Sequence, residues 1–74
     1  MDELQRLRGE IDAIDRDLVE LFRRRMAVTR QVGEYKRAKG IPVLDPERER
    51  QLLQSKGELA GEELRPAAIT LFQT

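Results

Sequence analysis

A stripe of apolar residues with helical spacing runs along the first half of the chain. It recurs every three or four residues, which is the period of one helix face, at Leu4, Leu7, Ile11, Ile14, Leu18, Leu21, Val28, Val32 and Tyr35. The spacing predicts an apolar residue at position 25, where the chain has Arg25. A charge in a surface meant for burial is costly unless an opposite charge pairs with it. No acidic residue lies three or four positions from Arg25, so an anionic ligand is favoured as its partner.

The stripe belongs to one long predicted helix. Asp2 and Gln5 form a capping-box pattern at its start, and Gly40 with Pro42 two residues later indicates its end, so the helix spans about 3–39. At 1.5 Å per residue it would be about 55 Å long, whereas a chain of this size has a radius of gyration near 11 Å. The remaining residues cannot cover such a stripe, so we expect a second copy to do so.

The rest of the chain predicts two shorter helices after a loop at 40–45. Asp45 and Pro46 are typical of a helix start, and a helix over about 46–56 would turn Leu52 and Leu53 inward and end at Gly57. A last helix is predicted over about 64–74. Its apolar pattern is still running at the end of the sequence, so we expect this helix to be truncated. The predicted fold class is all-α.

Composition narrows the possible functions. The chain has 74 residues, enough for one small domain, with neither cysteine nor histidine, which excludes disulfides and the common metal ligands. Basic and acidic residues balance at fourteen each, so binding to nucleic acid or to a membrane is not expected. We expect a cytoplasmic protein that works by placing charges and hydrogen bonds, without a metal or cofactor.

Two further cations on the long helix can join Arg25. Lys36 lies eleven residues beyond it, about 16 Å along the axis on nearly the same face, so the two side chains could hold a ligand between them. Arg8 lies seventeen residues the other way, about 25 Å from Arg25, and cannot join that site within one chain. An antiparallel second copy would bring its own Arg8 across, giving a symmetric dimer with two shared sites. Taken singly, Arg8 and Lys36 would be ordinary helix-surface charges.

These residues resemble a known family. The pattern consists of Leu7-Arg8-x-x-Ile11-Asp12-x-Ile14-Asp15-x-x-Leu18, then Leu21-x3-Arg25-x6-Val32-Gly33-x2-Lys36, then Pro42-Val43-x-Asp45-Pro46-x-Arg48-Glu49-x3-Leu53. It is similar to that of the all-helical (AroQ-type) chorismate mutases over practically the whole chain. The resemblance implies an interlocked antiparallel homodimer that rearranges chorismate to prephenate, in the biosynthesis of phenylalanine and tyrosine, without a covalent intermediate, metal or cofactor.

The resemblance also implies roles for individual residues. Arg8 of the partner chain and Arg25 would bind the two carboxylates of chorismate, and Lys36 would donate to the ether oxygen and touch a carboxylate. Glu49 and the backbone amide of Asp45 would hold the ring hydroxyl. The carboxylate end would be supported by Arg48.

One departure from the family pattern bears on activity. In the family the last helix continues for two to three more turns and carries a serine and a glutamine that contact the substrate, and this sequence has neither position. We therefore expect the 74-residue chain to be a weaker catalyst than its relatives. Two alternatives stay open: an isochorismate-pyruvate lyase, which shares the fold and the cationic site, and a non-catalytic dimerisation or regulatory module.

Overall fold

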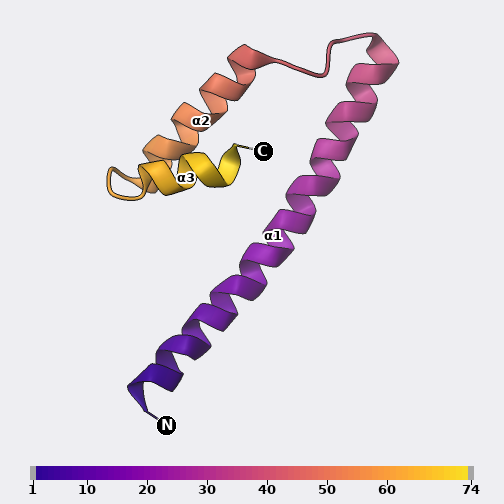
Figure 1. Ribbon diagram of the computed structural model, residues 1–74. Helices are drawn as coiled ribbons and strands as arrows, with labels where there is room; N and C mark the ends of the chain where they lie inside the picture. The colour runs from indigo at the N-terminus through magenta and orange to yellow at the C-terminus, as the bar shows by residue number, and fades with distance from the viewer. Residues whose placement is uncertain (1, 74) are drawn as a thin grey trace. The chain divides into compact units, whose positions relative to one another are not determined.

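The computed structural model describes residues 2–73 and contains three α-helices (Figure 1). They are α1 (Glu3–Lys39), α2 (Pro46–Ala60) and α3 (Arg65–Phe72). The predicted all-α class, with a long first helix and two shorter ones, is confirmed. The chain forms two compact units, one ending at Ile41 and the other beginning at Pro42, and each is described by itself below.

Both ends of α1 are capped by groups that satisfy its free backbone atoms. The Asp2 carboxylate accepts a hydrogen bond of 2.8 Å from the Gln5 amide, and Lys36, Arg37 and Lys39 lie in the last turn, where the helix dipole favours cations. Gly40 ends the helix in the left-handed conformation, with φ of 69° and ψ of 24°. The Gly40 amide donates to the Arg37 carbonyl at 3.3 Å, and the Ile41 amide donates to the Lys36 carbonyl at 2.8 Å. This pair of bonds is a Schellman motif.

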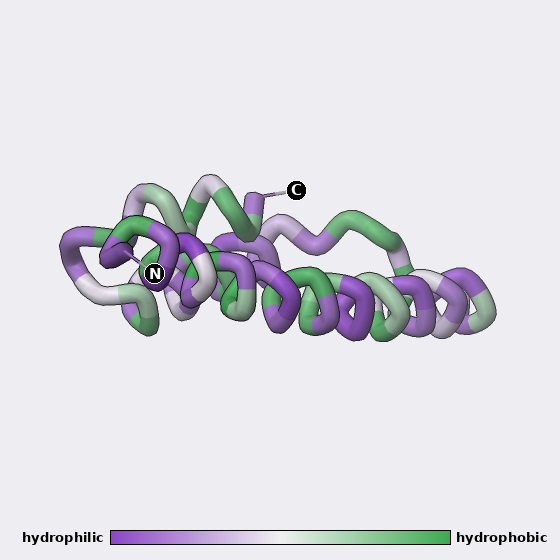
Figure 2. The backbone as a smooth tube through the Cα atoms, turned by 90° about the horizontal axis from the view of Figure 1, so that it is seen from below, coloured by the Kyte–Doolittle hydropathy of each residue, from purple (hydrophilic) through white to green (hydrophobic). Residues whose placement is uncertain are grey.

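The apolar stripe of α1 is uncovered. Each of its nine apolar side chains is between 42% and 59% exposed, and no residue of α1 is buried. Hydrophobic and hydrophilic residues alternate along the whole helix (Figure 2), so the stripe runs the length of α1 with one interruption at Arg25. Burying such a surface gains about 25 cal/mol per Å², and within its own unit α1 has nothing that could bury it.

In the second unit, α2 packs against α3. Leu52 and Leu53 are half-buried, together with Lys56, Ala60, Ala68, Ile69 and Phe72, and Gly57 is buried. The predicted end of this helix was wrong: α2 continues through Gly57 to Ala60 and ends at Gly61, whose φ is 88°. A Cβ atom at Gly57 would lie 3.0 Å from Cγ of Arg65 and 3.5 Å from Cδ1 of Ile69. Gly57 therefore permits close approach of the two helices and does not terminate α2.

The last helix, α3, begins within the range predicted from the sequence and ends slightly earlier. Pro66 lies in its first turn, and the Thr70 hydroxyl donates to the Pro66 carbonyl at 3.1 Å. Phe72 is its last residue and Gln73 its C-cap, whereas the prediction extended to Thr74, which is outside the described residues. None of the helices described here combines the length and the apolar character needed to cross a membrane.

Candidate active site

The three candidate cations of the first unit lie on α1, as predicted from the sequence. Eleven residues separate Arg25 from Lys36 and seventeen separate it from Arg8, about 16 and 25 Å along the axis. The nearby Arg6 is held by local acids: its guanidinium pairs with Glu3 and, at 3.1 Å, with Glu10. Arg8 is exposed and makes no ion pair within residues 2–73. Arg8 is thus available to an anion that is not on its own helix.

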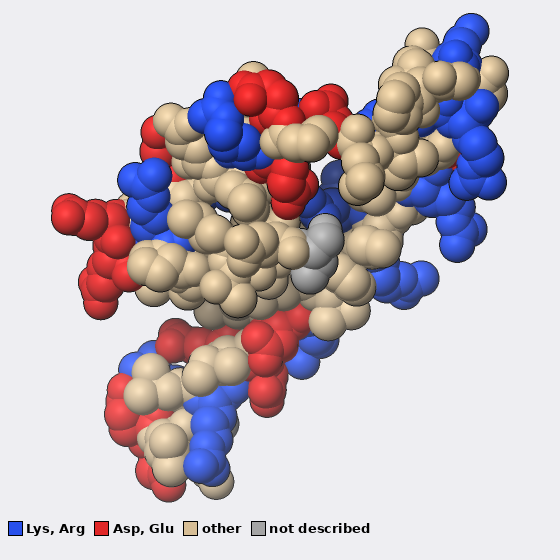
Figure 3. All heavy atoms as spheres, turned by 45° about the horizontal axis from the view of Figure 1, so that its top comes forward, with Lys and Arg blue, Asp and Glu red and all other residues tan. Residues whose placement is uncertain are grey.

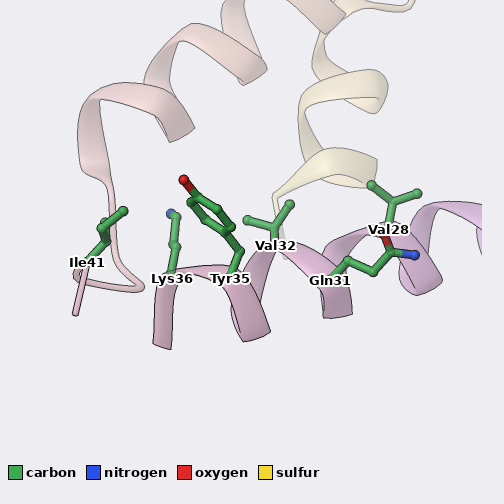
Figure 4. A pocket seen from close by; sticks show the side chains of 6 residues that line it. All are labelled: Val28, Gln31, Val32, Tyr35, Lys36 and Ile41. Atoms are coloured by element: carbon green, nitrogen blue, oxygen red, sulfur yellow. The ribbon is translucent and has the colours of Figure 1, made fainter. Parts of the chain in front are cut away.

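Lys36 stands out among the charged residues of α1. It is half-buried, whereas every other charged side chain of this helix is exposed. It lines an open hollow of about 380 Å³ together with Val28, Gln31, Val32, Tyr35 and Ile41. The side chains of Lys36, Tyr35 and Ile41 point to the same side there (Figure 4). The hollow thus combines an ammonium group and two polar groups with an apolar wall.

A second lysine at the C-terminal end of α1, Lys39, lies over an aromatic ring. The Lys39 ammonium lies 5.9 Å from the centre of the Tyr35 ring, within the range of a cation–π contact. The aromatic ring therefore holds Lys39, while Lys36 lines the hollow. Two lysines three residues apart thus both lie near Tyr35, Lys39 over its ring and Lys36 in the hollow that Tyr35 lines.

The other candidate residues lie at the start of α2. Asp45 is the N-cap, and its carboxylate accepts a hydrogen bond of 3.0 Å from the Arg48 amide. Arg50 pairs with Glu47 at 2.5 Å, and this contact lowers the pKa of the Glu47 carboxyl, against a smaller opposing effect of desolvation. Arg48 and Glu49 are exposed and form no ion pair with any residue that the structure describes. One carboxylate and one guanidinium are therefore presented on the first turn of α2.

The predicted site is divided between the two units. Arg8, Arg25 and Lys36 belong to the first unit, and Asp45, Arg48 and Glu49 belong to the second. Their assembly into one site stays a prediction. Ile41 and Gln31, which line the hollow beside Lys36, were not singled out from the sequence. An apolar residue directly after a helix-ending glycine was the available signal for Ile41, because a Schellman motif is often accompanied by an apolar contact at that position.

Charge is distributed unevenly along α1 and its cap. Residues 2–22 carry seven acidic and three basic side chains, and residues 23–39 carry seven basic and one acidic. The net charges are therefore −4 and +6. Lys and Arg side chains gather where α1 reaches its C-terminal end, at the upper right of the view (Figure 3). Arg25 and Lys36 thus lie in a strongly positive segment, which attracts anions.

Across the described residues, no three acidic side chains are grouped so that they could hold a metal ion.

Comparison with known proteins identifies the family. Residues 7–74 match the family model described as chorismate mutase type II. The chain belongs to this family. The matched range includes all six candidate residues of this chorismate mutase type II domain, from Arg8 to Glu49.

Several curated proteins are similar to this chorismate mutase type II domain. The T-protein of Haemophilus influenzae is 45% identical over 56 residues, which are 76% of this chain and 15% of that protein. The chorismate mutase of Methanocaldococcus jannaschii is 36% identical over 52 residues, 70% of this chain and 52% of that protein. The 4-amino-4-deoxychorismate mutase of Streptomyces pristinaespiralis is 33% identical over 75 residues, 99% of this chain and 58% of that protein. The chain thus spans between about one seventh and three fifths of these relatives. No solved structure matches it significantly.

Proposed function

We propose that this domain catalyses the rearrangement of chorismate to prephenate as a homodimer with two shared active sites. The observation that carries the proposal is Arg25, a single cation in the apolar stripe of α1, in a chain that belongs to the chorismate mutase type II family. A dicarboxylate substrate brings two anionic groups for the cations of the proposed site to bind. Guanidinium groups suit this task because they can bind carboxylates through two parallel hydrogen bonds.

Three features of α1 support an antiparallel pair of chains. The uncovered apolar stripe needs a partner of matching length, and a second copy of α1 provides one. Antiparallel pairing sets the acidic half of one helix, with charge −4, against the basic half of the other, with charge +6. It also carries the partner's Arg8 toward the segment between Arg25 and Lys36, which the chain's own Arg8 is too far away to reach.

In the proposed site each residue has one task. Arg25 and the partner's Arg8 bind the two carboxylates, with Arg48 supporting one of them. Lys36 donates to the ether oxygen, and Glu49 with the backbone amide of Asp45 holds the ring hydroxyl. The capping bond from the Arg48 amide to the Asp45 carboxylate fixes the first turn of α2, which carries this second group of residues.

The mechanism needs no nucleophile, because one bond breaks and another forms within a single molecule. Binding both carboxylates holds the flexible enolpyruvyl arm over the ring in a reactive pose, which removes much of the entropic cost of reaching the transition state. Negative charge grows on the ether oxygen as its carbon–oxygen bond breaks, and the Lys36 ammonium stabilises that charge. A fixed donor of this kind is worth about 3–4 kcal/mol by analogy with oxyanion holes.

The test is to incubate the purified chain with chorismate, follow its loss, and identify the product. Arg25→Gln removes the charge from the stripe and should lower kcat/KM by about a hundredfold or more. The matched control is Arg24→Gln, which removes the adjacent charge outside the stripe and should leave kcat/KM nearly unchanged. Equal effects of the two substitutions would contradict the assignment of Arg25. Absence of prephenate would favour a non-catalytic module, and release of pyruvate from isochorismate would favour a lyase.

A second candidate substrate is the amino analogue of chorismate. The support is the similarity to the 4-amino-4-deoxychorismate mutase of Streptomyces pristinaespiralis, which extends over 99% of this chain. The Glu49 carboxylate could face an amino group as well as a hydroxyl. Assaying chorismate and 4-amino-4-deoxychorismate side by side gives the preference as the ratio of their kcat/KM values. A ratio in favour of the amine would replace chorismate as the proposed substrate.

A further inference from the structure

We infer that Ile41 is a positioning residue that holds the Lys36 side chain in its working orientation. The inference rests on the proposed function, in which Lys36 donates to the ether oxygen. It concerns only the first unit of the chain, where the end of α1 and the residues after it are described together.

The backbone ties Ile41 directly to Lys36. Gly40 turns the chain back in the left-handed conformation, with φ of 69°, and the Ile41 amide donates to the Lys36 carbonyl at 2.8 Å. A Schellman motif of this kind places the residue after the glycine back over the last helical turn. The Ile41 side chain accordingly lines the same hollow as Lys36 and points to the same side (Figure 4).

Exposure separates Ile41 from the other apolar residues of the loop. Its side chain is 43% exposed, against 65% for Val43 and 85% for Leu44. Lys36 is half-buried in turn. Ile41 lies on one side of Lys36 in the hollow and Tyr35 on the other (Figure 4). A lysine can bury its methylene stem against apolar side chains of this kind.

This cover matters because a lysine is intrinsically hard to fix. Its side chain has four rotatable bonds and loses more conformational entropy on ordering than most others. A donor contributes fully to transition-state stabilisation only if it already points at the position where charge develops. Restricting the stem with Ile41 lowers that ordering cost before the substrate arrives.

The first experiment uses Ile41→Ala, with Ile41→Leu as the conservative variant and Leu44→Ala as the matched control in the same loop. Ile41→Ala should lower kcat for chorismate about tenfold with KM changed less than about twofold, because Lys36 acts mainly in the transition state. Ile41→Leu should restore most of kcat, and Leu44→Ala should behave like the unmodified chain. A change in KM alone, or equal losses in Ile41→Ala and Leu44→Ala, would overturn the inference.

A second measurement does not depend on turnover. Carbon-13 relaxation of the Lys36 methylene groups should show greater mobility in Ile41→Ala than in the unmodified chain, and Ile41→Leu should restore the original order. Unchanged Lys36 mobility in Ile41→Ala would show that Ile41 does not hold the lysine, whether or not the protein is active. Increased mobility in a protein that does not convert chorismate would support the positioning role and count against the proposed function instead.

Discussion

Three arginines stand side by side at positions 23 to 25, yet only the third falls on the apolar stripe of α1. Successive residues of a helix are turned by about 100°, so identical side chains in sequence have different surroundings. Arg23 lies beside Phe22 and Met26 in a separate shallow hollow of the helix surface, whereas Arg25 interrupts the row that needs a partner. Arg25 is therefore a candidate site residue because of its position on the helix, and its residue type alone would not distinguish it from Arg23 and Arg24.

Arg25→Leu should separate ligand binding from assembly. It restores the apolar stripe, so the proposed dimer should be as stable as before or more so, by up to about 1–4 kcal/mol. Chorismate binding should be lost, because a carboxylate no longer has its guanidinium. Calorimetric titration with chorismate and sedimentation at several concentrations measure the two effects. A dimer that dissociates on this substitution would show that Arg25 forms a structural ion pair between the chains.

Lys36→Ala should lower turnover more than affinity. Its ammonium is assigned to charge that develops only as the ether bond breaks, so kcat should fall by about two to three orders of magnitude. KM should change much less. Steady-state kinetics of the two variants Lys36→Ala and Lys36→Arg give both constants. A rise in KM without a fall in kcat would contradict the role at the ether oxygen.

At the scale of helices, most of the structure follows from local signals. Asp2, Gly40 and the Asp45-Pro46 pair place the ends of α1 and the start of α2 as the sequence predicts, because caps and left-handed glycines act on their immediate neighbours. Gly57 was misread as a stop because its role depends on Arg65 and Ile69 of another helix. Ile41 was missed for a different reason: an apolar residue after a helix-ending glycine indicates a Schellman motif, but it does not by itself show that this residue lines a hollow with Lys36.

Gly57→Leu should destabilise the packing of α3 on α2. Leucine favours a helix more than glycine does, but a side chain at this position meets Arg65 at 3.0 Å and Ile69 at 3.5 Å from its first carbon. We expect a loss of about 1–3 kcal/mol, measured by denaturant unfolding of the whole chain. Gly9→Leu is the matched control, because no atom lies within 4 Å of a Cβ there. Equal stability of the two variants would contradict the close approach at Gly57.

At the scale of the whole molecule, two properties of α1 bear on association. The apolar stripe can be buried in either orientation of two paired helices. The charges of −4 and +6 on the two halves of α1 distinguish antiparallel from parallel pairing. Parallel pairing would set like charges against each other over both halves. Apolar burial therefore supplies affinity in the proposed dimer, and the charge pattern supplies orientation.

Salt should weaken this association while leaving it in place. Raising the ionic strength shortens the Debye length from about 10 Å at 0.1 M to about 3 Å at 1 M, which screens the attraction between the acidic and basic halves. The dissociation constant from sedimentation equilibrium should rise severalfold, and the melting temperature should still increase with protein concentration. A dissociation constant that falls with salt, or a melting temperature independent of concentration, would contradict the proposed pairing.

The uncovered stripe of α1 also bears on the kinetics of folding. Helices α2 and α3 are neighbours in sequence, joined by residues 61–64, so their contact closes a short loop and should form quickly at any protein concentration. In the proposed dimer, the stripe of α1 is buried only after an encounter with a second copy. Refolding from denaturant should therefore show a fast phase with a constant rate, followed by a slower phase that accelerates in proportion to the amount of protein present.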